Sequence, residues 1–226
     1  MSELFELSEQ YAEMLQRGLR LSGENQGFFI AGRVRHLATG VPPGFRPRRI
    51  LDFGCGTGHT TPVLADAFPG AEIVGVDTAD NALAWAETRF GSVAVRFRRV
   101  ADLSAEEPFD LCYTNGVFHH IDPARRPEAL AAIRKVLWPG ALLALFENNP
   151  WNPGARMVMS RIPFDRDARP LSPPVATRLV RQGGFVPGPV RSLFYFPRAL
   201  APLRFAEGWL GRLPLGAQYC VLARRP

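Results

Sequence analysis

Three glycines at alternate positions follow an apolar run in the stretch ILDFGCGTG, residues 50–58. Glycine reaches backbone conformations and close approaches that residues with a side chain cannot. Gly54, Gly56 and Gly58 therefore predict a tight loop in which a ligand can lie against the backbone and the amides of the following helix. The stretch is typical of a short buried strand that runs into such a loop.

Apolar strand-like segments alternate with helical patterns along the rest of the chain. Several are apolar on both faces, which favours a parallel sheet covered by helices on both sides. The strands are expected within 48–54, 72–77, 93–100, 109–116, 141–149, 189–196 and 217–226. Helices are expected around Leu4, Leu7, Tyr11 and Leu15; Ile30, Val34 and Leu37; Leu64, Ala67 and Phe68; Leu83, Ala86 and Phe90; Leu130, Ile133 and Leu137, ending at Pro139-Gly140; and at 174–182. The fold class is therefore α/β.

The 226 residues, 46% of them hydrophobic, suffice for one domain with appendages. We expect an N-terminal helical cap over residues 1–40. A main domain should follow over 41–226, with a lid insertion at about 150–215, because this stretch is irregular and rich in proline.

The spacing of the glycines restricts the class of ligand. A dinucleotide fingerprint would place glycine or alanine where His59 stands, and the lysine of a phosphate-binding loop is also missing. Asp77 ends the second predicted strand, where its carboxylate can accept hydrogen bonds from two ribose hydroxyls. These features predict a ligand that contains a nucleoside without a pyrophosphate.

Four segments, ILDFGCGTG, VGVD, FDLCYTNGVFHHI and IRKVLWPGALLALFE, in this order and spacing, resemble the class I S-adenosylmethionine-dependent methyltransferases. The resemblance covers roughly residues 48–147. It implies a Rossmann-like, seven-stranded, mostly parallel sheet with an antiparallel C-terminal hairpin and helices on both faces. It also implies that S-adenosylmethionine is the cofactor.

The resemblance assigns the cofactor contacts to the ends of the first four strands. The three glycines would lie along the amino-acid part, Asp77 would hold the ribose, Asp102 would read the adenine amino group, and Asn115 with Gly116 would lie beside the sulfonium. The full expected set is Asp52, Gly54, Cys55, Gly56, Gly58, Asp77, Thr78, Asp102, Leu103 and Asn115. Alternatives stay open for several of these residues. Asp52 alternatively orders the turn by accepting hydrogen bonds from loop amides, and Asp77 alternatively caps a helix, although Asp80 is available for that. Asp102 is alternatively an ordinary polar loop residue, and Cys55 and Cys112 are alternatively packing residues.

Methyl transfer is an in-line displacement, so the protein must mainly align acceptor and methyl group. A general base helps where the acceptor is a hydroxyl, and His119 or His120 is the candidate because imidazole titrates near neutrality. Either ring alternatively packs against the cofactor or holds the loop. The expected acceptor contacts are Tyr11, Glu147 and Asn148, of which Glu147 and Asn148 alternatively cap the turn after their strand.

The acceptor is expected to be a partly apolar small molecule or lipid-linked metabolite, methylated at oxygen. The cap over it is assigned to the N-terminal helices, PFDRDARP (163–170) and the aromatic segment 192–215. We interpret that segment as a hydrophobic lid or, alternatively, as a peripheral membrane contact.

The net charge of +6 comes from arginine clusters at strand edges and does not indicate a nucleic acid acceptor, and the motifs of nucleobase methyltransferases are missing. An RNA methyltransferase and a non-catalytic cofactor-binding protein remain alternatives. Three separated cysteines without metal spacing predict no metal site and a reduced, cytoplasmic compartment. Neither a signal peptide nor a membrane span is expected.

Overall fold

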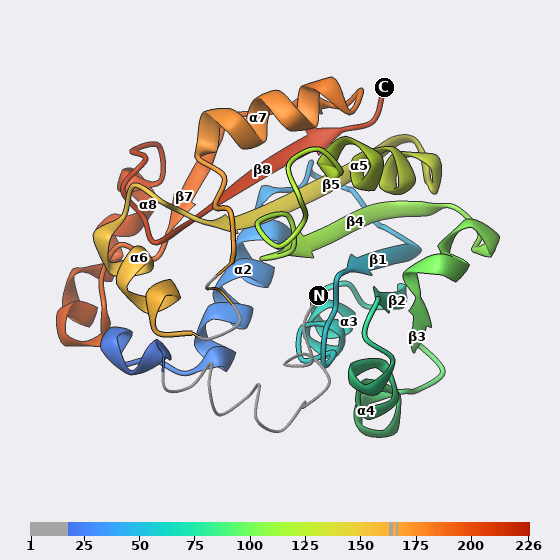
Figure 1. Cartoon of the computed structure of the whole chain (residues 1–226), viewed down its shortest axis with the longest axis horizontal. Coiled ribbons are helices and arrows are strands. Elements are labelled where there is room, and N and C mark those ends of the chain that lie inside the picture. Colours follow the sequence, from blue (N-terminus) through green and yellow to red (C-terminus); the bar gives the residue numbers. More distant parts are fainter. Residues whose placement is uncertain (1–17, 163–164, 166) are drawn as a thin grey trace.

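A computed structural model describes residues 18–162, 165 and 167–226 of the chain (Figure 1). The helix expected around Leu4 and Tyr11 lies outside these residues. The strands are β1 (Arg49–Phe53), β2 (Glu72–Asp77), β3 (Val95–Arg99), β4 (Phe109–Asn115), β5 (Leu137–Asn148), β6 (Val186–Pro187), β7 (Arg191–Leu193) and β8 (Gln218–Arg224). The α-helices are α2 (Gln26–Gly40), α3 (Thr61–Ala67), α4 (Asp80–Phe90), α5 (Arg126–Lys135), α6 (Pro153–Ser160), α7 (Pro173–Gln182) and α8 (Glu207–Leu210), and shorter 3-10 segments are η2 (Arg20–Ser22), η3 (Val100–Ala105) and η5 (Arg198–Ala206).

The strands form one sheet in the order β3-β2-β1-β4-β5-β8-β6, with β7 also paired to β8. The first five strands run parallel, and β8 runs antiparallel to β5. This confirms the mostly parallel sheet with antiparallel C-terminal strands. The sheet has eight strands instead of seven because the last position is divided between β6 and β7. Pro187 ends β6 and Pro189 lies within the break, and each lacks the N–H that a continuous ladder needs.

Both faces of the sheet are covered (Figure 1). Leu51 and Phe53 of β1 belong to the core beneath α5 and α7, whereas Ile50 belongs to the core beneath α2, α3 and α4. This follows from the alternation of side chains along a strand. Every residue of β1 after Arg49 is buried, and its apolar residues Ile50, Leu51 and Phe53 face both cores.

The helix α5 ends earlier than the sequence pattern predicts. Leu137 was expected on the inner face of this helix, but it lies in β5 and pairs with Phe109 ahead of a bulge. The reason is Pro139, since a residue that precedes proline disfavours helical dihedral angles and adopts an extended conformation. Trp138 is thereby drawn into the strand, and the helix stops at Lys135.

The helix α2 confirms the apolar pattern of Ile30, Val34 and Leu37, which are buried against the sheet. Its first turn is capped by Asn25, whose side chain accepts a hydrogen bond from the Phe28 amide at 2.9 Å. Part of the expected cap thus packs into the main core; the boundaries at residue 40 and at 150–215 stay predictions. None of the described helices has the length and apolar character needed to cross a bilayer.

Candidate functional site

A cavity of about 730 Å³ lies beyond the carboxyl ends of β1, β2 and β4, where a parallel sheet presents its loops. Its size is in the usual range for small-molecule sites. The walls come from the glycine loop, the loop after β4, one face of α2 and the turn that carries Asp165. The expected contacts that line it are Asp52, Gly54, Cys55, Gly56, Asp77, Thr78, Asn115, Gly116, His119, His120 and Asn148.

The three glycines of the loop have different reasons for lacking a side chain. All have positive φ, but a Cβ on Gly54 would lie 2.2 Å from Val117, and one on Gly58 would lie 2.8 Å from Phe97. Among the residues that the structure describes, none has an atom within 4 Å of that position at Gly56. Gly54 and Gly58 are therefore required by packing, and Gly56 is the one whose bare backbone faces open space. Gly58 is not among the residues that line the cavity.

The carboxylate of Asp77 ties the end of β2 to the glycine loop. One oxygen accepts a hydrogen bond from the Gly56 amide at 2.8 Å, and the other accepts one from the Ala79 amide at 3.0 Å. Asp77 thus caps the turn before α4 and also lines the cavity. Asp80, which was available as the cap, forms an ion pair with Arg99 instead.

Asp52 is a buried carboxylate, 2% exposed, on the same face of the sheet as α3. It accepts a hydrogen bond from the Thr61 hydroxyl at 2.9 Å rather than from loop amides. Burial raises the pKa of Asp52 to about 7, and the nearby negative charge of Asp77 acts in the same direction. A cation bound beside Asp52 would therefore be stabilised by ionisation of the Asp52 carboxyl group.

A chain of polar side chains forms another wall of the cavity. Arg33 of α2 donates to the Tyr113 hydroxyl at 2.9 Å and to the Gln218 side chain at 3.0 Å, and Gln218 donates to Asn148 at 3.0 Å. Arg33 is only 5% exposed, and within the described residues it forms no ion pair at 4 Å. Burial raises the pKa of Tyr113 to about 12, so this phenol stays neutral. The wall thus presents a fixed positive charge, and the nearby guanidinium of Arg33 partly opposes the rise in the pKa of Asp52.

His119 lies between two carboxylates. Its Nδ1 is 2.5 Å from Glu147, and its Nε2 is 3.6 Å from Asp165. Burial alone would disfavour the imidazolium, but Glu147 and Asp165 outweigh this and raise the pKa of His119 to about 10. His119 therefore carries a proton at neutral pH and is poorly suited to accept another. His120, 3.4 Å from Asp165, is the candidate base that remains.

Glu147 has a structural position behind the cavity. It is buried, accepts a hydrogen bond from the Phe118 amide at 2.8 Å and contacts His119, and it is not among the cavity-lining residues. The structure thus places Glu147 where it holds His119, and contact between Glu147 and the acceptor stays a prediction. Asn148, the next residue, does line the cavity.

Other expected contacts lie away from the cavity. Asp102 is exposed in η3, and Leu103 is buried in the core beneath α5. Neither residue lines the cavity. Tyr11 lies outside the described residues. None of the described residues that line the cavity comes from 192–215. The lid and membrane interpretations of that segment stay predictions.

Sequence reasoning missed Arg33 and assigned Asp165 no role of its own. Arg33 interrupts the apolar stripe of Ile30, Val34 and Leu37, and a charged residue in such a stripe is a usable signal. Asp165 belongs to the segment expected to cap the acceptor, but only the folded chain shows that it contacts both histidines.

The arginine clusters do not gather at the cavity. Arg49 begins β1, at the end remote from the glycine loop, and it pairs with Glu72 at 2.7 Å and Glu106 at 2.8 Å. Arg225 donates to the backbone carbonyl of Arg134 at 2.7 Å. These contacts agree with ordinary surface and strand-edge charge.

Residues 51–143 match the family described as "Methyltransferase domain". The chain is 34% identical over 133 residues to a trans-aconitate 2-methyltransferase of Methylobacterium nodulans, covering 59% of this chain and 48% of that protein. It is 35% identical over 80 residues to a malonyl-[acyl-carrier protein] O-methyltransferase of Bacillus anthracis, covering 34% of this chain and 30% of that protein. The chain thus spans half or less of the length of these two curated relatives.

Among solved structures, the fold is similar to a Thermotoga maritima protein described as a SAM-dependent methyltransferase, possible histamine N-methyltransferase. The TM-score is 0.67 with 16% identity, and the match covers 98% of both chains. At this level of identity the similarity concerns the fold alone.

Proposed function

We propose that the chain is an S-adenosylmethionine-dependent methyltransferase that methylates an oxygen atom of a small, partly apolar carboxylic acid, supported by the methyltransferase-domain match over residues 51–143. When bound, S-adenosylmethionine supplies an activated methyl group. The residues present fit it: Gly56 offers open backbone, Asp77 a carboxylate for the ribose, and Asp52 a buried acid beside the same space.

The observation that carries the acceptor class is the buried guanidinium of Arg33. A planar guanidinium matches the two oxygens of a carboxylate, and burial strengthens this interaction because solvent screens it less. Apolar side chains of Phe29, Ile30 and Ile162 line the same cavity, which suits an acid with a carbon skeleton. The two curated relatives named above are described as enzymes for trans-aconitate and for malonyl-[acyl-carrier protein], and both names denote acids.

A carboxylate acceptor also agrees with the protonation of the site. A carboxylate oxygen is already a nucleophile, so an O–CH3 bond forms as the S–CH3 bond breaks, and no proton has to be removed. His119 therefore need not act as a base, and its positive charge helps to hold an anion. For a hydroxyl acceptor, His120 remains the proposed base.

The test is transfer of a labelled methyl group from S-adenosylmethionine to a panel of small di- and tricarboxylic acids. Each acid is compared with its amide and its alcohol analogue. We expect label in the acids only. Because a methyl ester is hydrolysed by mild base and an ether or N-methyl group is not, the label should be released as methanol on alkaline treatment.

Label that is stable to alkali would contradict oxygen methylation of a carboxylate. A preference for amide or alcohol analogues over the acids would contradict the acceptor class. Labelled RNA in a parallel reaction would favour the alternative of an RNA methyltransferase.

A further inference from the structure

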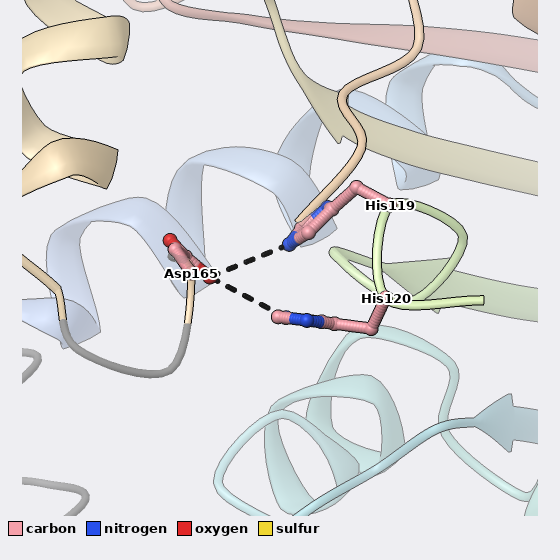
Figure 2. Close-up of side chains that lie close together, drawn as sticks. All are labelled: His119, His120 and Asp165. Atoms are coloured by element: carbon pink, nitrogen blue, oxygen red, sulfur yellow. Dashed lines mark ion pairs between the residues drawn. The ribbon is translucent and has the colours of Figure 1, made fainter. Parts of the chain in front are cut away.

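Two imidazoles and one carboxylate converge at the edge of the cavity (Figure 2). His119 and His120 come from the loop after β4, and Asp165 comes from the segment between α6 and α7 on the opposite side. The Nε2 atoms of both histidines point toward the same oxygen, Oδ1 of Asp165, at 3.6 and 3.4 Å. Both contacts are ion pairs when the imidazoles are protonated, and their separations exceed the roughly 2.7–3.2 Å typical of a hydrogen bond between nitrogen and oxygen.

The same separations also agree with the spacing of atoms that share a metal ion. Ligands bound at about 2.0–2.1 Å in tetrahedral geometry lie about 3.4 Å apart. The three ligand atoms all lie within 4.8 Å of one another, so small side-chain rotations would bring them around one ion. The side chains of His119 and Asp165 are 3% and 4% exposed, and that of His120 is 18% exposed.

Glu147 is the hydrogen-bond partner that orients the ring of a metal-binding histidine. Histidine ligands generally donate their other ring N–H to a carboxylate, which fixes the ring and the tautomer. Nδ1 of His119 lies 2.5 Å from Glu147, whose second oxygen is held by the Phe118 amide. This arrangement turns Nε2 of His119 toward Asp165 and away from the core.

The geometry points to a Zn²⁺ site formed by His119 Nε2, His120 Nε2 and Asp165 Oδ1, in which the bound ion displaces the proton that His119 Nε2 carries in the free protein. Two imidazole nitrogens favour a transition metal of this kind over Mg²⁺ or Ca²⁺, which prefer oxygen ligands. Three protein ligands leave a fourth position open, as in catalytic zinc sites. No cysteine takes part, which is why the spacing of cysteines in the sequence did not indicate the site.

All three ligands line the cavity, so the open position faces the space assigned to the acceptor. The ion would hold an acceptor oxygen there; this role rests on the proposed function, whereas the binding of the ion does not. The ion would at the same time link Asp165 to the loop after β4. Near the same place the Arg169 amide donates to the His119 carbonyl at 2.8 Å, which already joins the two segments.

The experiment measures Zn²⁺ binding to the untagged full chain after removal of metals with a chelator. It is carried out by equilibrium dialysis without S-adenosylmethionine or acceptor, so the outcome does not depend on methyl transfer. Co²⁺ is used in parallel because its visible absorption reports the coordination geometry. We expect one equivalent of Zn²⁺ and a tetrahedral Co²⁺ spectrum.

The variants His120→Gln and Asp165→Asn should each weaken Zn²⁺ affinity by more than the roughly 10- to 100-fold that loss of an outer-shell partner costs. The loss of Zn²⁺ affinity in Glu147→Gln should fall within this roughly 10- to 100-fold range. The matched controls His59→Gln and Asp122→Asn, which line the same cavity elsewhere, should bind Zn²⁺ like the wild type. Circular dichroism confirms that each variant is folded.

The inference is overturned if the folded wild-type chain binds no more Zn²⁺ than a His120→Gln/Asp165→Asn double variant. It is also overturned if the two controls reduce binding as much as the two ligand variants do.

Discussion

Arg33 and Asp52 are two charged side chains buried on the same face of the sheet. Asp52 was predicted as a site residue because it directly precedes the glycine loop, where a local motif is informative. Arg33 was not predicted, because its partners Tyr113 and Gln218 are far away in the sequence. At the scale of single residues, the sequence thus indicated what belongs to a local motif and missed what only tertiary contacts create.

Asp52 gives the protein a pH-dependent stability. Its pKa of about 7 in the folded state lies above the value near 3.9 expected for the unfolded chain. The folded state therefore binds this proton more tightly than the unfolded state does. The protonated Asp52 side chain adds to the free energy of unfolding at low pH, and this contribution is lost as the pH rises through about 7. Asp52→Asn removes this titration. The free energy of unfolding of the variant, taken relative to that of the wild type, should therefore rise by about 2 to 3 kcal/mol between pH 5 and pH 8.

Urea unfolding at both pH values measures this difference. The matched control is Asp66→Asn, an exposed aspartate on α3, which should change stability equally at both pH values. If Asp52→Asn changes the free energy of unfolding by the same amount at both pH values, the assignment of a raised pKa to Asp52 is contradicted.

Arg33 should determine the affinity for an acidic acceptor. Arg33→Gln removes the positive charge, and a hydrogen bond to a charged group contributes about 1.5–3 kcal/mol. We expect KM for the carboxylic acid to rise about 10- to 100-fold while affinity for S-adenosylmethionine stays the same. Steady-state kinetics measures this, with the exposed neighbour Arg35→Gln as the control. An unchanged KM in a folded Arg33→Gln protein would exclude Arg33 as the carboxylate contact.

At the scale of elements, the alternation of apolar segments predicted the strands and helices well, because each pattern depends on the burial of one face. The end of α5 was predicted wrongly because the restraint that Pro139 places on Trp138 acts ahead of the proline. The junction of the segment around Asp165 with the loop after β4 could not be predicted, because no local pattern specifies which distant loops meet.

The glycine loop offers an element-scale test, since its glycines serve different purposes. Gly54→Ala would place a methyl group 2.2 Å from Val117, so it should lower the free energy of unfolding by about 1–3 kcal/mol or more. Gly56→Ala meets no neighbour within 4 Å and costs only the strain of its positive φ, of order 1 kcal/mol. It should nevertheless weaken cofactor binding, because the added methyl group enters the cavity.

Thermal unfolding and calorimetric titration separate the two effects. The variant Gly44→Ala, at another positive φ with open space, is the control for strain alone. If Gly56→Ala loses stability as Gly54→Ala does and binds the cofactor normally, the loop does not face the ligand in the way described.

At the scale of the whole molecule, the parallel sheet gathers its loops at one edge, and this edge holds the cavity. The glycine loop, Asp77 and the histidines come from different crossovers but meet there because β1, β2 and β4 run in the same direction. The start of β1, with the ion-paired Arg49, lies at the other edge. The mostly parallel sheet with antiparallel C-terminal strands was predictable from the family resemblance, whereas the composition of the acceptor wall was not.

The central claim is that this cavity binds S-adenosylmethionine through the glycine loop and Asp77. Calorimetric titration of the wild type and of Asp77→Ala with S-adenosylmethionine tests it most directly, with Asp66→Ala as the matched surface control. We predict one binding site in the wild type and in the control, and loss of binding in Asp77→Ala. Wild-type affinity in a folded Asp77→Ala protein would contradict the account.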